Sequence, residues 1–324
     1  MSKHGSPLDP ISLDGVRTSR LEKRHSKVSL QAAGRPWTAG GTFREFLARL
    51  PHILAAESFR QVVERVVQAK RRGARVLLGM GAHPIKVGLG PVIVDLMERR
   101  LLDGVALNGA GIIHDAELAL AGHTSEDVAA ALVDGSFGMT ADTADFLNAA
   151  IKGARAVDGL GAAVGRALLA SGAPHLAQSI VAAGARLNLP VTVHVALGTD
   201  TIHLHPSVDP AATGAASHLD FRIFARAVSG LQGGVYLNVG SAVLLPEVFL
   251  KAVTLVRNLG YQLDDLTTVN MDFHRHYRPR VNVLQRPTRV GGRGIELIGH
   301  HEIMIPLLAA AIVERMAGEN MAGG

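Results

Sequence analysis

The sequence predicts an α/β protein with a Rossmann-like, doubly wound and mainly parallel sheet, preceded by an extended N-terminal arm. Three observations lead to this fold class. Short runs that are apolar throughout alternate with longer helical stretches rich in Ala and Leu, which is the pattern of strands buried on both faces of a parallel sheet. Aromatic residues make up only 4% of the chain, which suits close packing of helices against a parallel sheet. No linker interrupts residues 74–318, so we expect one domain there.

Residues 1–40 are expected to form the arm, because they are rich in Ser, Gly, Pro and charge and show little apolar periodicity. Residues 41–324 are expected to form the single domain. It opens with a helical region over residues 42–73, which Pro51 should break and Gly73 should end.

Six strand-like runs follow, and each ends in glycine, histidine or another polar residue. They are ARVLLGMG (74–81), GVALNGAG (104–111), PVTVHVALG (190–198), GGVYLNVGS (233–241), LTTVNMDF (266–273) and GIELIGHH (294–301). Helical stretches between and after them include SEDVAAALVDG (125–135), VGRALLASG (164–172), LPEVFLKAVTLVRNLG (245–260) and EIMIPLLAAAIVERMAG (302–318).

Small and polar residues at the strand ends predict a ligand site, because ligands of open α/β sheets bind beyond the carboxyl ends of the strands. Glycine turns let backbone N–H groups approach a pyrophosphate at a helix N-terminus, and three turns have this character: 79–81, 108–111 and 238–241. None is a G-x-G-x-x-G followed by an acidic residue about twenty positions later, so the usual dinucleotide fingerprint is not met.

The histidines are expected to bond to substrate or to solvent rather than to a metal, and no metal ligand is predicted. His203 and His205, His274 and His276, and the pair His300–His301 have spacings that a metal site could use. Alternate residues of a strand point to opposite faces, however, so His-x-His supplies two ligands only on an irregular turn. His194 is expected to be a core histidine, and Glu126 and Asp127 are expected to cap a helix.

The composition of the chain argues against several other classes of protein. The formal net charge is +5, but a nucleic-acid site needs a concentrated basic patch with stacking aromatics. One dense basic segment occurs near the start, at residues 17–27, and it is better explained as a solvated arm. Nucleic acid is therefore an unexpected partner. No apolar run is long enough to span a membrane. Cysteine is absent, which excludes disulfides and favours a cytoplasmic location.

The order of these motifs resembles the deoxyhypusine synthase family, from about Gly73 to Met316. The resemblance is clearest in LLGMGAHPIKVGLGPVIVDLMERRLLDGVALNGAGIIHDAE (77–117), and it continues in LPVTVHVALGTD (189–200), GGVYLNVGSAVLLPEVFLKAVTLVRNLG (233–260) and ELIGHHEIMIPLLAAAIVERM (296–316). It implies a Rossmann-like domain that binds NAD, and a homotetramer with sites between paired subunits.

Carried over position by position, the resemblance implies a set of cofactor contacts, with His114 standing where the family has a carboxylate. Together with Gly111 of the second glycine turn, the set comprises Ala82, His83, Asn108, Gly109, Ala110, Asp200, Gly240, Ser241, Val269, Asn270, Gly299 and His300.

The chain departs from the family at the substrate. The family passes an aminobutyl group through a lysine in a W-G-K motif, which this chain lacks. The matching segment, residues 272–294, contains no lysine, no lysine follows Lys251, and Trp37 is the only tryptophan. Acidic groups that would hold a polyamine are replaced in this segment by Arg275, Arg278, Arg280, Arg286, Arg289 and Arg293. Arginines repel a polycation and attract an anion.

We therefore expect an NAD-dependent enzyme that oxidises a small substrate, with or without group transfer, and not a typical polyamine. The expected catalytic groups are His114, His203, His274 and His276, since a neutral histidine can act as a general base, and Lys86, the one nearby amine for an imine. Three alternatives stay open: deoxyhypusine or homospermidine synthesis, a metal-dependent hydrolase, and a non-catalytic NAD-binding protein.

Overall fold

Six parallel strands form one sheet in the order β3-β2-β1-β4-β5-β6 in the computed structural model, which describes residues 10–318. The strands are β1 (Val76–Met80), β2 (Gly104–Asn108), β3 (Val191–His194), β4 (Val235–Val239), β5 (Thr267–Asp272) and β6 (Arg293–Ile298). Each lies within one of the six runs predicted from the sequence, except that β6 starts one residue earlier. The structure thus confirms the predicted fold class, and the chain order reverses between β1 and β4.

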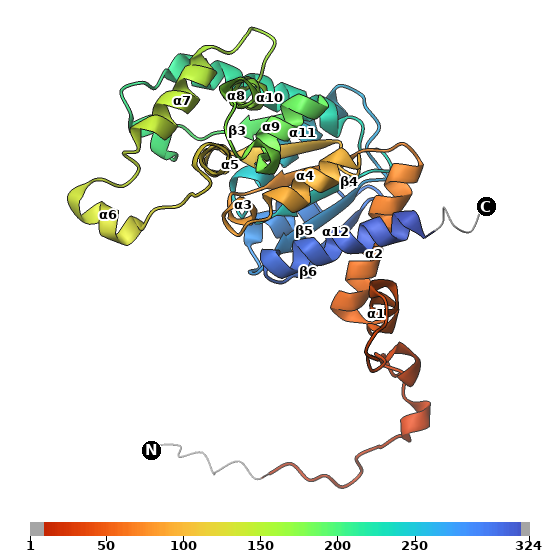
Figure 1. The fold of residues 1–324 in the computed structure, drawn as a ribbon. Helices are drawn as coiled ribbons and strands as arrows, with labels where there is room; N and C mark the ends of the chain where they lie inside the picture. Colours follow the sequence, from red (N-terminus) through yellow and green to blue (C-terminus); the bar gives the residue numbers. More distant parts are fainter. Residues whose placement is uncertain (1–9, 319–324) are drawn as a thin grey trace, which may run out of the picture.

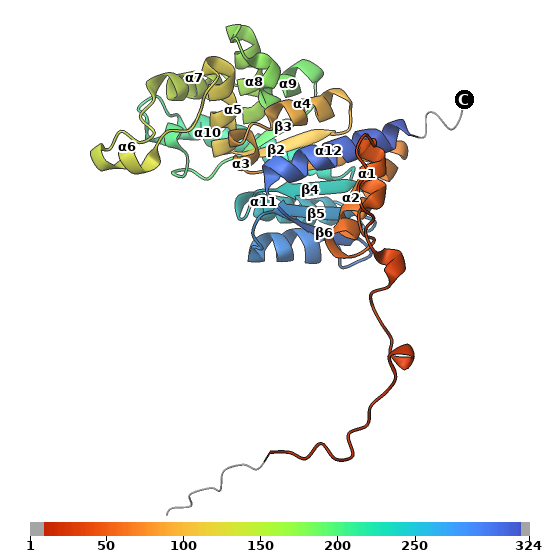
Figure 2. The same cartoon turned by 60° about the horizontal axis from the view of Figure 1, so that its bottom comes forward.

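Helices cover both faces of the sheet (Figures 1 and 2). On one face lie α2 (Leu54–Arg71), α4 (Gly90–Glu98), α5 (Gly109–Ala121), α8 (Leu160–Ser171), α9 (Ile180–Leu187) and α12 (His301–Ala317), and α7 (Ala141–Lys152) packs against α8 and α5. On the other lie α10 (Pro210–Val228) and α11 (Leu244–Asn258). Shorter helices are α1 (Phe43–Arg49), α3 (His83–Lys86), α6 (Val128–Asp134) and the segments η1 (Leu21–Lys23), η2 (Leu30–Ala32), η3 (Leu176–Gln178), η4 (Thr201–Leu204) and η5 (Pro279–Gln285).

The described part of the arm, residues 10–40, extends away from the domain with only η1 and η2 as regular structure (Figures 1 and 2). Its last residues join the domain, where the backbone N–H of Arg35 donates to the carbonyl of Arg49. The domain's first helix, α1, starts at Thr42, whose hydroxyl and the Glu45 carboxylate form a capping box. The predicted ranges 1–40 and 41–324 also include residues 1–9 and 319–324, which lie outside the described residues.

Both faces of the strands are buried, as the continuous apolar runs predict. Leu78 and Met80 of β1 pack under α2, α4 and α12, whereas Leu77 packs with Tyr236 and Phe249 on the α10–α11 face. The Tyr236 and Phe249 rings stack with centroids 3.8 Å apart. None of the helices between residues 10 and 318 is both long and apolar enough to cross a bilayer.

Two buried aspartates fix helix starts to the core. Asp115 of α5 accepts hydrogen bonds from the Ser179 hydroxyl and from the backbone N–H groups of Ile180 and Val181, at the start of α9. Asp220 of α10 accepts from the N–H groups of Gly161 in α8 and Val193 in β3, at 2.9 and 2.8 Å. Burial raises the pKa of Asp115 to about 6 and that of Asp220 to about 7, although these donors lower both values.

Asp220→Asn should change how stability depends on pH. The raised pKa means that the wild-type carboxyl contributes its full stabilisation below the unfolded pKa of about 4 and loses it as the pH rises through about 7. An amide oxygen can still accept both N–H groups, since both donate to the same oxygen of Asp220. Urea unfolding at several pH values between about 4 and 8 should therefore show the wild type losing stability relative to the variant as pH rises. Parallel pH profiles for the two proteins would contradict this explanation.

Gly79→Ala should destabilise the protein by about 1–3 kcal/mol, because a Cβ there would overlap the Tyr236 hydroxyl inside a packed core. Gly214→Ala is the matched control: Gly214 is an exposed position in α10 with no atom near its Cβ direction, and alanine there should stabilise the helix by about 0.5–1 kcal/mol. Urea unfolding measures both effects. Adding Tyr236→Phe to Gly79→Ala should recover part of the loss, and a strictly additive double variant would exclude this contact as its cause.

Candidate functional site

The carboxyl ends of the six strands meet at one edge, and the turns after β1 and β4 touch there. The N–H of Gly81 donates to the carbonyl of Val239 at 3.0 Å, and a Cβ on Gly81 would overlap the carbonyl oxygen of Gly240. The N–H of Gly240 in turn donates to the carbonyl of Met271 at 3.0 Å, and Gly240 has a φ of 59°. Glycine at both positions allows the close approach of the two turns. This is the topological switch point of the sheet.

A pair of histidines lies against the switch point. The Nδ1 atoms of His83, at the start of α3, and His301, at the start of α12, are 2.9 Å apart. His301 is fully buried, and its Nε2 faces the carbonyl oxygen of Met271 at 3.4 Å. A Cβ on Gly240 would lie 2.7 Å from the His301 ring. The glycine that forms the β4 turn therefore also makes room for this ring.

The ring of Phe273, which directly follows β5, contacts the rings of four histidines. Its centroid is 5.4 Å from His83, 4.9 Å from His274, 5.5 Å from His301 and 5.8 Å from His300, with which it is stacked. His276 joins the group through a ring contact with His274. The structure thus brings together four of the predicted site histidines, His83, His274, His276 and His300. Sequence reasoning did not select Phe273 or His301 as site residues; the only signal was the His300–His301 pair itself.

Below these rings, Asn238 of β4 and Asn270 of β5 form a buried amide pair. The Nδ2 of Asn238 donates to the Asn270 side-chain oxygen at 2.8 Å and to the carbonyl of Ser241 at 2.9 Å. Ser241 itself accepts from the N–H of Leu245 and so supports the start of α11. Two of the predicted cofactor contacts, Ser241 and the side-chain oxygen of Asn270, therefore already have hydrogen-bond partners within the protein.

The glycine turn after β2 is occupied by the protein's own carboxylate. Asn108 caps α5 by accepting from the N–H of Gly111 at 2.9 Å, and the N–H of Ala110 donates to Asp200. A Cβ on Gly109 would overlap the Asp200 carboxylate, so glycine is needed here for an internal contact. The predicted amides of Ala110 and Gly111 thus already have partners, and Asp200 stands between this helix terminus and any ligand.

His203 and Asp200 each keep one atom without a partner. The Nδ1 of His203 accepts from the N–H groups of Gly198 and Asp200, at 3.2 and 3.4 Å, so the proton of the neutral ring is on Nε2. That Nε2 and the Oδ2 of Asp200 are buried and have no hydrogen-bond partner within the described chain. Burial raises the pKa of Asp200, against the opposing effects of His203 and of the Ala110 N–H. The segment after β3 therefore contains one buried donor and one buried acceptor that are not satisfied within the described chain.

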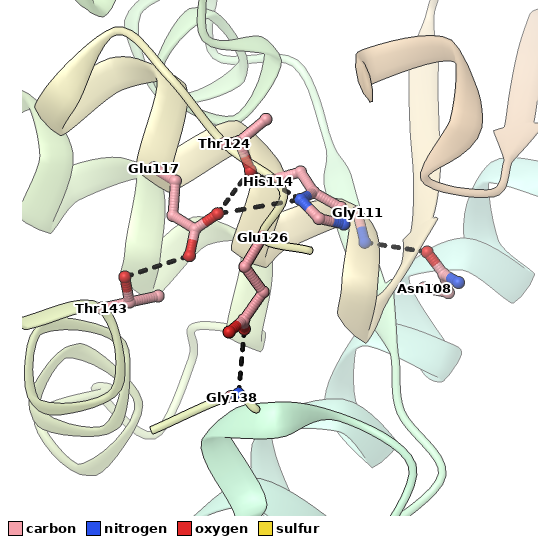
Figure 3. A network of polar contacts seen from close by, with 8 residues as sticks. All are labelled: Asn108, Gly111, His114, Glu117, Thr124, Glu126, Gly138 and Thr143. Atoms are coloured by element: carbon pink, nitrogen blue, oxygen red, sulfur yellow. Dashed lines mark hydrogen bonds and ion pairs between the residues drawn. The ribbon is translucent and has the colours of Figure 1, made fainter. Parts of the chain in front are cut away.

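His114 belongs to a separate network between α5, the following loop and α7 (Figure 3). Its Nδ1 lies 2.6 Å from the Thr124 hydroxyl, which donates to Glu117, and Thr143 donates to the other oxygen of Glu117 at 3.1 Å. Burial raises the pKa of Glu117, but the hydrogen bonds from His114, Thr124 and Thr143 outweigh it and the net shift is downward. Because Thr124 gives its proton to Glu117, it accepts from His114, which leaves Nε2 of His114 as a free lone pair.

The sequence interpretation of the following loop is confirmed at one residue and wrong at the other. Asp127 caps α6, which begins at Val128, as expected, whereas Glu126 does not cap a helix. Glu126 accepts from the N–H of Gly138 at 2.9 Å and so closes the loop around α6. His194 is a buried core residue whose Nε2 bonds to the Thr192 hydroxyl, as predicted, and burial lowers its pKa to about 4.

The remaining predicted groups lie outside these clusters. Lys86 is exposed at the end of α3. Arg275 and Arg278 form ion pairs with Glu296 and Glu247, at 2.9 and 3.6 Å, so acidic groups from other segments neutralise part of the arginine-rich stretch. Across residues 10–318, no three or more His, Asp or Glu side chains are grouped as metal ligands would be.

Comparisons with known proteins agree on the fold. No protein-family model matches the sequence, and no curated protein matches it significantly. Among solved structures, a proposed LOR/SDH protein from Methanococcus maripaludis is 14% identical with a TM-score of 0.50, over 81% of this chain and 71% of that one. AgrE, in a ternary complex with ornithine and NAD+, is 12% identical with a TM-score of 0.53, over 83% of this chain and 35% of AgrE. A proposed deoxyhypusine synthase from Entamoeba histolytica is 10% identical with a TM-score of 0.50, over 86% of this chain and 95% of that one. The chain therefore spans about a third of AgrE.

Thr124→Val should destabilise the protein by about 1–3 kcal/mol, because it leaves the Nδ1 of His114 and one Glu117 oxygen without the hydroxyl that joins them. Thr124→Ser keeps the hydroxyl and should restore most of the loss. Thr254→Val is the control, since the Thr254 hydroxyl is exposed and only bonds back to the carbonyl of Leu250 in its own helix; it should change the free energy of unfolding by less than about 0.5 kcal/mol. Equal effects of Thr124→Val and Thr254→Val would show that the network contributes nothing.

Proposed function

We propose that this protein is an NAD-dependent enzyme that oxidises a small substrate at the carboxyl edge of its sheet. The observation that carries the proposal is the reversal of strand order between β1 and β4, with His83 and His301 at the reversal and unpartnered atoms of Asp200 and His203 after β3 on the same edge of the sheet. Dinucleotides bind across such a reversal in doubly wound folds. The likeness to AgrE, which holds NAD+ and ornithine in its own complex, supports the same choice of cofactor.

The residues after β2 and β3 suit the ribose of a dinucleotide but not its pyrophosphate. A carboxylate with a free oxygen suits a ribose hydroxyl, and Asp200 has such an oxygen. The start of α5 does not suit a pyrophosphate, because Asp200 and Asn108 already take the Ala110 and Gly111 amides. We therefore propose that Asp200 binds the ribose. The other proposed cofactor contacts from the sequence that surround the switch point are Ala82, His83, Gly240, Ser241, Asn270, Gly299 and His300.

The chemistry requires a hydride acceptor and a base. Bound NAD+ would accept a hydride from a substrate carbon, and a neutral histidine would accept the proton from the attached oxygen or nitrogen. Among the histidines proposed from the sequence, His114 presents a free Nε2, whereas the Nε2 of His203 is a donor that can orient the substrate instead. His274 and His276 lie beside Phe273.

The proposed substrate is small and not a typical polyamine. Residues 272–294 contain neither a lysine nor an acidic side chain after Asp272, so an aminobutyl relay of the deoxyhypusine synthase kind has no amine there. The one lysine proposed for an imine, Lys86, is exposed. Because Glu296 and Glu247 pair with two of the arginines, we do not extend the proposal to a strongly anionic substrate.

We also propose that the chain forms a homo-oligomer, for which a homotetramer is the expectation from the family resemblance. The arm supports this proposal, because Ile11 and Leu30 are 89% and 93% exposed in the single chain, and another copy would bury them. The cytoplasmic location stays a prediction from the sequence.

NAD+ should bind the full chain in isothermal titration calorimetry, and Asp200→Asn should weaken that binding by about tenfold or more, because a hydrogen bond to a charged group contributes about 1.5–3 kcal/mol. Asp209→Asn is the matched control: Asp209 caps α10, and asparagine caps equally well. The absence of NAD+ binding would refute the proposed cofactor. Tighter binding by Asp200→Asn would instead place a phosphate at the start of α5. Spermidine oxidation with formation of a new carbon–nitrogen bond would return the function to aminobutyl transfer.

A further inference from the structure

The pair of histidines at the switch point has a fixed direction of hydrogen bonding. Within residues 10–318, the one group at hydrogen-bond distance from Nε2 of His301 is the carbonyl oxygen of Met271 at 3.4 Å, and a carbonyl can only accept. His301 is therefore protonated on Nε2 when neutral, and its Nδ1 carries a lone pair. That lone pair faces Nδ1 of His83 at 2.9 Å, so His83 must carry its proton on Nδ1. The neutral His83 ring then has its free lone pair on Nε2.

The surroundings keep His301 in this neutral form. Burial lowers its pKa most, and His83 lowers it further, while Asp272, the carbonyl of Met271 and Glu302 raise it; the net shift is downward. His274 and His300 also contact the Phe273 ring. His301 is also held in place, because its ring fills the space beside Gly240.

We propose that His83 is the general base of the site and that His301 is the residue that positions it. This inference rests on the proposed function. Nε2 of His83 would take the proton from the oxygen or nitrogen of the substrate, and bound NAD+ would supply the acceptor for the hydride from the attached carbon, so that a double bond would form between the two substrate atoms. The imidazolium of His83 stays hydrogen-bonded to the lone pair of His301. We prefer His83 to His114 as the base because its partner His301 lies against Gly240, in the turn after β4 at the switch point. His114 instead faces the loop that contains Thr124.

The tautomers can be read without any turnover. Long-range proton–nitrogen NMR spectra of the 15N-labelled full chain, near pH 8, should show His83 protonated on Nδ1 and His301 on Nε2. His83→Gln and His301→Gln assign the two rings. A wild-type His83 protonated on Nε2 would overturn the inference.

Two substitutions of His301 separate positioning from mere packing. His301→Phe keeps a ring but removes the acceptor, and it should shift His83 to the Nε2-protonated tautomer. His301→Gln can still donate to Met271 and accept from His83, and it should leave the tautomer of His83 unchanged. His300→Phe is the control, since His300 stacks on Phe273 without bonding to His83. An unchanged His83 tautomer in His301→Phe would show that His301 only fills space.

Adding NAD+ links the pair to the proposed function. Saturating NAD+ should move the His83 ring resonances more than those of His114, and larger shifts at His114 would assign the base there instead. The two failures are distinguishable: if NAD+ does not bind, the proposed function is wrong, whereas if NAD+ binds with its effect centred on His114, only the assignment of His83 is wrong.

Discussion

The structure depends on the parallel pairing of β1 with β4, which are distant in sequence and adjacent in the sheet. Their turns approach so closely that Gly81 has no room for a side chain, and the His301 ring fills the space beside Gly240. Every strand of the sheet runs in the same direction, so all six carboxyl ends reach the same edge, and the polar residues that follow each strand are collected there. Without this pairing, His83 and His301, 218 positions apart, would not meet.

Three buried aspartates serve one electrostatic purpose in this fold. Each places a carboxylate at the start of a helix, where backbone N–H groups lack partners within the helix and favour negative charge. Asp115 does so at α9 and Asp220 at α8, and both are needed to join the helices to the core. Asp200 does so at α5 but keeps one oxygen free. The same arrangement therefore satisfies the carboxylate in two places and, in the third, leaves one oxygen without a partner among the described residues.

The histidines divide into groups with different hydrogen-bonding directions. His203 is fixed as an Nε2 donor by two backbone N–H groups, whereas His114 is fixed with a free Nε2 by a threonine and a glutamate. The direction at His83 is set by a second histidine and, through it, by a backbone carbonyl. Each of these rings is therefore fixed as a donor or an acceptor by its own neighbours.

The sequence by itself determined the six strands, several of the helices and the edge on which polar groups collect. Continuous apolar runs predict strands buried on both faces, and the residues that end those runs, such as Gly81 and Asn108, follow from the geometry of strand ends. Only the tertiary structure decided which of these residues are free to bind. The Ala110 and Gly111 amides looked available, but Asp200 and Asn108 take them, and the partner of His83 comes from the last helix of the domain. Periodicity reports local burial, whereas hydrogen-bond partners between segments 90 or 218 positions apart depend on how the chain folds back on itself.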